Sequence, residues 1–123
     1  MPAAPDPFVE HVCELLSPLG PVVARRMFGG WGLSVDGMNV GLVAWNTLYL
    51  KGNAETEPRW LAAGCQPFVY EAKGKPMRLN YFTAPEEAME SPALMQPWAR
   101  LALQAAVAAR APRKKAAARS RRV

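Results

Sequence analysis

Apolar and polar positions alternate along the chain with two different periods, which separate helices from strands. Apolar residues recur every three or four positions over about residues 7–17, which predicts a first helix. The same spacing over residues 56–64 predicts a short helix, started by Thr56 or Asn53 and ended by Gly64. It returns after Ser91-Pro92 and predicts a last helix.

Two prolines interrupt the pattern of that last helix. Pro97 lies inside it, where a proline removes a backbone hydrogen bond, so we expect a kink or a restart there. Pro112 is expected to end it.

Between the helices the period falls to two, which indicates strands joined by short turns. Asp36-Gly37 is typical of a type I′ hairpin turn, Asn46-Thr47 is a weaker turn, and Lys73-Gly74-Lys75-Pro76 is a compact one. We predict an α+β domain with an antiparallel sheet of about five to six strands and the N- and C-terminal helices packed on one side. The predicted strands are residues 22–28, 32–35, 38–45, 48–51, 68–72 and 77–82.

Net charge adds a boundary that hydropathy does not show. Residues 1–109 hold eight basic and ten acidic residues, whereas residues 110–123 hold seven basic residues and no acidic one. Residues 113–122 have no apolar side chain larger than alanine with which to order themselves. The chain therefore divides into a folded domain, residues 7–109, and a disordered basic tail, residues 110–123.

Length and cysteine content favour a cytoplasmic protein. A chain of 123 residues can bury one core without metals or disulfides. It shows neither an apolar run of membrane-span length nor the features of a signal peptide. Cys13 and Cys65 are far apart in sequence, and two separate thiols are favoured over a disulfide between them.

The residue types that carry catalysis or bind metals are sparse. His11 has no Cys or carboxylate at ligand spacing, which favours a surface histidine over a zinc ligand. Glu86-Glu87 and Glu90 precede helical segments, where capping is favoured over acid–base catalysis. The sequence therefore predicts a protein that is not an enzyme and has no cofactor or metal.

Gly29-Gly30-Trp31-Gly32 is glycine-rich like a phosphate-binding loop. It lacks the Gly-Lys-Ser/Thr of a P-loop and the spacing of the dinucleotide fingerprint. A tight turn or bulge between strands is therefore favoured. An enzyme or small-ligand protein with a pocket beside Gly29-Gly30 stays open as the alternative function.

Aromatic and basic residues come together in the last two predicted strands. Such a set could form a base-stacking platform for nucleic acid, but two amphipathic strands carry the same residues when they build a core, and we favour the core. The strong ribonucleoprotein strand motif is missing. The residues concerned are Phe68, Tyr70, Tyr81 and Phe82, with Lys73, Lys75 and Arg78.

Several segments resemble, in the same order, the N-terminal domain of the TfoX/Sxy family. The resemblance covers about residues 8–109, and its most specific parts are Met-Phe-Gly-Gly and Lys-Gly-Lys-Pro. The matching segments are residues 26–33, 48–51, 67–70 and 73–76, and Tyr81 ahead of residues 85–88.

This resemblance implies a fold similar to that of secretion chaperones and a transcription-related role. The family's best-known members are bacterial regulators of competence for DNA uptake, which act with the cyclic-AMP receptor protein at promoters. Those regulators have a second, C-terminal domain where this chain has its basic tail, and Pro97 interrupts the last helix. The resemblance therefore implies the fold but not the competence role itself.

We expect a regulatory interaction module with two binding regions. The sheet domain would bind a protein partner, such as a transcription factor or polymerase component, and the tail would bind nucleic acid without sequence preference. A tail that only keeps the protein soluble is the alternative. The residues expected to contact the partner are Arg26, Phe28, Gly29, Gly30, Trp31, Lys73 and Lys75. Those expected to contact nucleic acid are Arg113, Lys114, Lys115, Arg119, Arg121 and Arg122.

Overall fold

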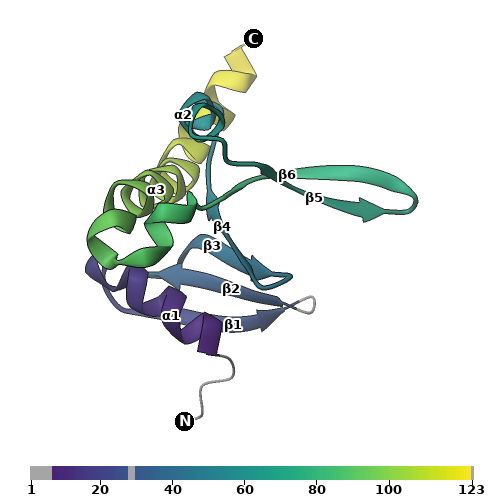
Figure 1. The fold of residues 1–123 in the computed structure, drawn as a ribbon. Coiled ribbons are helices and arrows are strands. Elements are labelled where there is room, and N and C mark those ends of the chain that lie inside the picture. Colours follow the sequence, from purple (N-terminus) through teal and green to yellow (C-terminus); the bar gives the residue numbers. More distant parts are fainter. Residues whose placement is uncertain (1–6, 28–29, 123) are drawn as a thin grey trace.

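The elements of the computed structural model follow one another in the order that the hydropathy pattern predicts (Figure 1). The structure describes residues 7–27 and 30–122, with the side chains of Met27 and of residues 110–122 outside the description. The helices are α1 (Pro7–Leu16), η1 (Ser17–Leu19), α2 (Glu57–Ala62), η2 (Glu86–Glu90) and α3 (Pro92–Arg122). The strands are β1 (Val22–Met27), β2 (Gly30–Val35), β3 (Met38–Ala44), β4 (Thr47–Lys51), β5 (Pro67–Ala72) and β6 (Lys75–Thr83).

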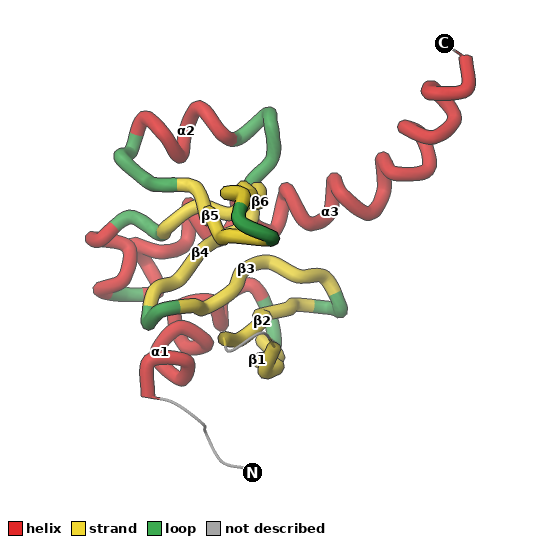
Figure 2. The backbone as a smooth tube through the Cα atoms, turned by 90° about the vertical axis from the view of Figure 1, so that its right-hand side faces the viewer, coloured by secondary structure: helices red, strands yellow, loops and turns green. Residues whose placement is uncertain are grey.

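The six strands form one antiparallel sheet in the order β1-β2-β3-β4-β6-β5. Consecutive strands from β1 to β4 are neighbours, because their connecting turns are too short for a helical crossover. α1 and α3 pack on the same face of the sheet (Figures 1 and 2). We call the other face the open face. The predicted α+β architecture is confirmed, while its likeness to secretion chaperones stays a prediction.

The core lies between the helices and the covered face of the sheet. Trp60, from α2, is fully buried, and its ring stacks on Phe82 of β6 at a centroid distance of 5.9 Å. It also contacts Trp98 of α3 at 5.2 Å, so α2 is joined to both layers. Alternate residues of the central strands meet the apolar stripes of α1 and α3, and among the most buried are Val12, Leu15, Leu33, Val40, Leu48, Leu50 and Met95.

Three turns of the sheet have positive φ at both central residues, as a type I′ turn requires, and the third of them, Lys73-Gly74, joins β5 to β6. Asp36-Gly37, with φ of 52° and 76°, forms the turn predicted from the sequence. The next turn is Trp45-Asn46, with φ of 52° and 56°, so the predicted turn at Asn46-Thr47 is wrong by one residue. Thr47 already pairs as the first residue of β4.

The short helix α2 starts and ends as predicted. The backbone N–H of Thr56 donates to Asn53 Oδ1 at 2.9 Å, and the N–H of Asn53 donates to Thr56 Oγ1 at 3.0 Å. Gly64, at φ +83°, ends the helix, and the N–H of Cys65 donates to the Trp60 carbonyl at 3.0 Å. This left-handed ending turns the chain from α2 into β5.

Helix α3 is longer than the sequence predicts. Ser91 Oγ accepts the N–H of Leu94 at 3.2 Å, which confirms the predicted start. The helix passes Pro97 without a restart, and the residues assigned to a disordered tail continue it to Arg122, so the predicted end at Pro112 is wrong. A proline removes only one hydrogen bond, and the alanines on both sides of Pro112 favour a helix strongly. The division into a domain and a tail stays a prediction.

Candidate functional site

Two of the residues expected to contact a partner lie side by side at one edge of the sheet. Arg26 and Trp31 are cross-strand neighbours in β1 and β2, and the Arg26 guanidinium lies over the Trp31 ring at 5.4 Å. Trp31 is partly buried and packs against the core, whereas Arg26 is exposed. Phe28 and Gly29, from the same group, lie outside the described residues.

Gly30 has a packing role at the start of β2. A Cβ atom at this position would collide with the backbone carbonyl oxygen of Val43 in β3. Glycine is therefore needed for the close approach of the two strands. Gly30, Trp31 and Gly32 all belong to β2, so this part of the glycine-rich segment is strand. No described contact supports a ligand pocket beside Gly30.

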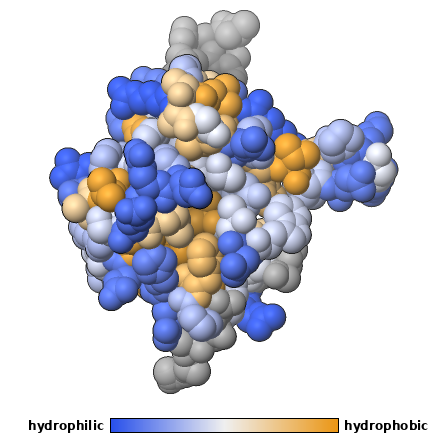
Figure 3. All heavy atoms as spheres, in the orientation of Figure 1, coloured by the Kyte–Doolittle hydropathy of each residue, from blue (hydrophilic) through white to orange (hydrophobic). Residues whose placement is uncertain are grey.

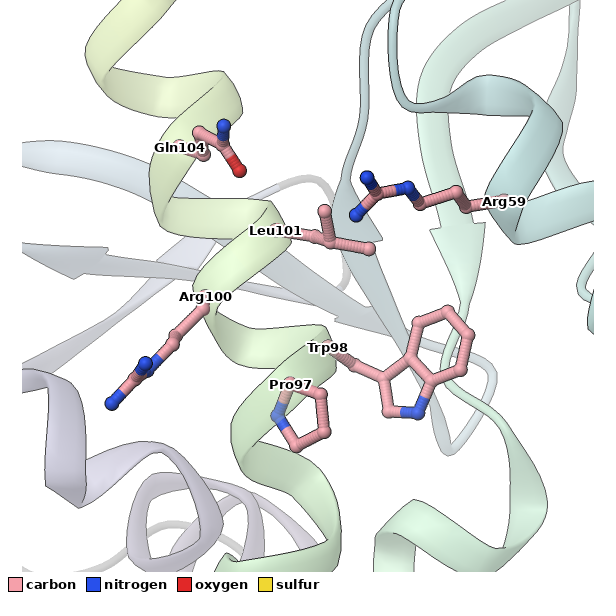
Figure 4. A pocket seen from close by; sticks show the side chains of 6 residues that line it. All are labelled: Arg59, Pro97, Trp98, Arg100, Leu101 and Gln104. Carbon is pink, nitrogen blue, oxygen red and sulfur yellow. The ribbon is translucent and has the colours of Figure 1, made fainter.

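A surface pocket of about 290 Å³ lies between α2 and α3. Figure 4 shows Trp98 and Leu101 of α3 beside it, with Arg59 reaching across from α2. Arg100 points from the other side of α3. The pocket offers an indole ring and two cations but no carboxylate or thiol among its lining residues.

A second pocket of about 520 Å³ lies along α1 and is lined by Pro7, Glu10, His11, Cys13 and Glu14. His11 is exposed, as predicted, and its Nε2 lies 2.9 Å from the Met89 carbonyl oxygen of η2. This histidine therefore joins α1 to η2.

The β5–β6 hairpin extends away from the body of the molecule, as Figure 1 shows. β6 pairs with β4 through Tyr81, Phe82 and Thr83, and the Asn80 carbonyl accepts the N–H of Gly52 just after β4 at 2.7 Å. Both strands of the hairpin then continue beyond these contacts to its tip. We call residues 67–80 the arm. It turns at Lys73-Gly74, with φ of 55° and 78°. Figure 3 shows a hydrophilic tip with apolar residues nearer the body.

The residues expected to contact a partner lie at opposite edges of the sheet. Lys73 and Lys75 lie exposed at the tip of the arm, beside the β5 edge of the sheet, whereas Arg26 lies on β1 at the opposite edge. The structure therefore does not bring the lysines together with Arg26 and Trp31 in one site.

The aromatic residues of the last two strands divide between two faces. Phe82 is fully buried opposite Leu50, as the core prediction requires. Phe68 and Tyr81 are only partly buried and Tyr70 is 37% exposed, so the core prediction is wrong for these three. They point to the open face, because the register places them on the side opposite to Phe82.

Trp45, which the sequence does not single out, completes an aromatic group there. Its side chain is 67% exposed, and its ring stacks on Phe68 at a centroid distance of 5.3 Å. Tyr49 meets Phe68 edge-on at 4.8 Å, and Tyr70 stacks on Phe68 at 6.0 Å. We call Trp45, Tyr49, Phe68 and Tyr70 the aromatic cluster. Burial raises the pKa of the Tyr49 hydroxyl above its usual range.

Charged side chains on the described open face are all basic. The strand register places Arg25 and Lys51 on this face and no Asp or Glu of a described strand. The Lys51 ammonium lies over the Tyr81 ring at 5.1 Å, and Asn39 Nδ2 donates to the Tyr81 hydroxyl at 2.7 Å. On the opposite side of the arm, Arg78 forms a 2.7 Å ion pair with Glu57 of α2.

The two cysteines are free thiols. Burial raises the pKa of both, and for Cys13 the nearby Glu10 carboxylate raises it further. A thiol with a raised pKa has little thiolate at neutral pH and is therefore a poor nucleophile.

Within residues 7–27 and 30–122, no helix is long and apolar enough to cross a membrane. No three His, Cys, Asp or Glu side chains of this part gather in a way that could hold a metal ion. The six tail residues expected to contact nucleic acid have side chains outside the description: Arg113, Lys114, Lys115, Arg119, Arg121 and Arg122.

Known proteins match most of this domain. The family model described as the TfoX N-terminal domain matches residues 14–106. A relative named DNA transformation protein TfoX1, from Aliivibrio fischeri, is 32% identical over 84 residues, which cover 68% of this chain. The match covers 40% of the relative, so this chain spans less than half of its length.

Proposed function

The chain belongs to the TfoX N-terminal domain family, and from this premise we propose that it is a non-enzymatic regulatory domain that acts in transcription by binding a protein partner. The proposal places it in the cytoplasm. The observation that carries it is the arm, whose apolar side chains Val69, Tyr70 and Met77 are 46%, 37% and 43% exposed. Exposed apolar groups of this kind are typical of protein interaction sites.

The edge of the arm suits one mode of binding in particular. β5 ends the sheet and pairs only with β6, so its outer backbone N–H and C=O groups have no strand partner. An extended segment of another protein could add to this edge as a further strand, with Val69 as an apolar contact. Lys73 and Lys75 at the tip would attract an acidic segment and increase the rate of association.

The basic tail would add affinity for nucleic acid without reading its sequence. Its seven cations would contact phosphates, and such contacts depend steeply on salt. The protein partner would then supply the specificity that the tail lacks. The Aliivibrio fischeri relative is named a DNA transformation protein, and a regulatory role for this chain in a process that involves DNA would agree with that name.

A charged residue on the edge strand tests the partner-binding role. Val69→Lys should abolish strand addition at β5, because lysine on an edge strand opposes pairing with another chain. The matched control is Val23→Lys, which changes a 51% exposed valine on the other edge strand, β1. Proteins captured by the full chain would be identified, purified and titrated against the wild type and both variants.

We expect Val69→Lys to weaken binding of the purified partner at least tenfold and Val23→Lys to leave it within about twofold, a tenfold change being about 1.4 kcal/mol. Equal losses in both variants, or no loss in Val69→Lys, would contradict binding at the β5 edge. Circular dichroism of both variants would show whether the fold is retained.

A further inference from the structure

The open face shares Tyr70 with the proposed partner site, and it combines two properties that strand addition at the β5 edge does not require. It carries the aromatic cluster, in which one exposed indole and two phenol rings surround Phe68. It also carries the basic side chains Arg25 and Lys51, in a domain whose residues 1–109 have two more acidic than basic residues. The acidic residues are thus concentrated away from this face.

The geometry of the aromatic cluster leaves flat ring surface available to a ligand. Trp45 lies on Phe68 with an interplanar angle of 27°, yet 67% of its side chain remains exposed. Tyr70 also lies at 27° to Phe68. Trp45 and Tyr70 thus each lie next to Phe68 and remain exposed, so each ring could receive a planar group. Unpaired nucleic acid bases are planar groups that stack on aromatic side chains.

The turn that holds Trp45 supports a role outside the core. Both Trp45 and Asn46 have positive φ, although turns of this type favour Asn, Asp or Gly at these positions. At the first central position of this turn, Asn, Asp or Gly would adopt the backbone conformation more easily than Trp45 and would expose less apolar surface. Its ring is nevertheless held in place by Phe68 and Tyr49.

We propose that the open face binds single-stranded DNA, with bases stacked on Trp45 and Tyr70 and phosphates held by Arg25 and Lys51. The positive charge of the face complements a phosphate backbone, and the aromatic rings explain why the strand must be single, since bases in a duplex are already stacked. Lys73 and Lys75 at the tip of the arm extend the basic path.

DNA rather than RNA fits the polar groups of the face. Asn39 Nδ2 donates to the Tyr81 hydroxyl at 2.7 Å, so this amide N–H and one lone pair of the hydroxyl oxygen are taken and do not reach a ribose 2′-hydroxyl. The 2′-hydroxyl is the group by which a protein tells RNA from DNA at a given site. Stacking on its own accepts every base, so little sequence preference is expected.

The experiment uses the full chain and follows the fluorescence of its tryptophans during titration with a 12-nucleotide oligo-dT. An oligomer of equal length made of abasic sites presents the same phosphates without bases, and the basic tail would bind both. The difference between the two affinities therefore reports stacking alone. Oligo-rU and duplex DNA of the same length are titrated in parallel.

We expect Trp45→Ala to weaken oligo-dT binding about 5- to 150-fold, because the loss of one base–aromatic stack is worth roughly 1–3 kcal/mol. Lys51→Gln should weaken oligo-dT and the abasic oligomer equally. The matched control is Leu61→Ala, which changes a 48% exposed apolar residue on α2 and should stay within about twofold.

Three results would overturn the proposal. The first is equal affinity for oligo-dT and the abasic oligomer. The second is tighter binding of oligo-rU or duplex DNA than of oligo-dT. The third is a dimer in sedimentation experiments that Trp45→Ala dissociates, since a second copy would then cover the face. Val69 points to the opposite side of the arm, so the Val69→Lys test of partner binding can fail or succeed independently.

Discussion

At the scale of single residues, Gly30 and Trp45 show what a sequence pattern can and cannot predict. The need for glycine at a strand connection followed from the cluster of glycines, and the contact with the Val43 carbonyl gives the physical reason at Gly30. The exposure of Trp45 could not be predicted, because an apolar residue at the end of a strand usually counts as core. Its position in a two-residue turn, beside Asn46, was the available signal.

Gly30→Ala should destabilise the domain by roughly 1–3 kcal/mol, because the added methyl group must push β2 away from the Val43 carbonyl. The free energy of unfolding would be measured by urea denaturation. Gly74→Ala is the control: a Cβ there meets no atom within 4 Å, and only the backbone conformation at φ +78° is strained. We expect a smaller loss, about 1 kcal/mol. A larger loss at Gly74 than at Gly30 would contradict the packing role of Gly30.

At the scale of elements, local patterns predict well wherever tertiary contacts agree with them. The boundaries of α1, α2 and most strands follow from periodicity, caps and turn residues. The arm differs because alternation predicts that residues 68–72 and 77–82 form strands without saying what lies on either side of them. β4 ends at Lys51, so the outer part of β6 has no neighbour except β5. The predicted core contacts of Phe68 and Tyr70 therefore do not form.

An arm of two strands should open more often than the central sheet, because an isolated hairpin is only marginally stable in water. Hydrogen exchange followed by NMR should give faster exchange for the amides of Tyr70 and Met77 than for those of Leu33 and Leu50. Amides of β6 that pair with β4, such as Phe82, should be intermediate or slow. Protection of the arm equal to that of Leu33 in the free protein would show that it is covered, and would count against an available edge at β5.

At the scale of the whole molecule, the charge composition changes at about residue 110, whereas helix α3 continues through this position. Helix α3 continues to Arg122, yet the last buried core residue is Ala106 among those described. Counting charges along the sequence places most of the basic excess in residues 110–123, but such a count does not reveal the basic open face. That face is assembled from β1, β4, β5 and β6, so its composition depends on sheet order and register, which hydropathy patterns leave undetermined.

Neutralising the tail tests its contribution to DNA affinity. A full-length variant with the six predicted nucleic-acid-binding residues, Arg113, Lys114, Lys115, Arg119, Arg121 and Arg122, changed to Gln would be titrated with duplex DNA at several salt concentrations. The slope of log K against log salt should fall in magnitude by about 0.9 for each duplex phosphate that the tail no longer neutralises. Melting temperature should not change, because the described core ends before the tail. An unchanged slope would leave the tail with a role in solubility only.

The uneven distribution of charge over the two faces also makes the folded domain an electric dipole. Carboxylates gather on the helical elements, at Glu10, Glu14, Glu57, Glu86, Glu87 and Glu90, while Arg25 and Lys51 lie on the open face. Such a molecule can turn its helical side toward a positively charged support and its open face toward a negatively charged one. It should therefore be retained at low ionic strength by anion exchangers as well as by cation exchangers, despite a formal net charge of +5.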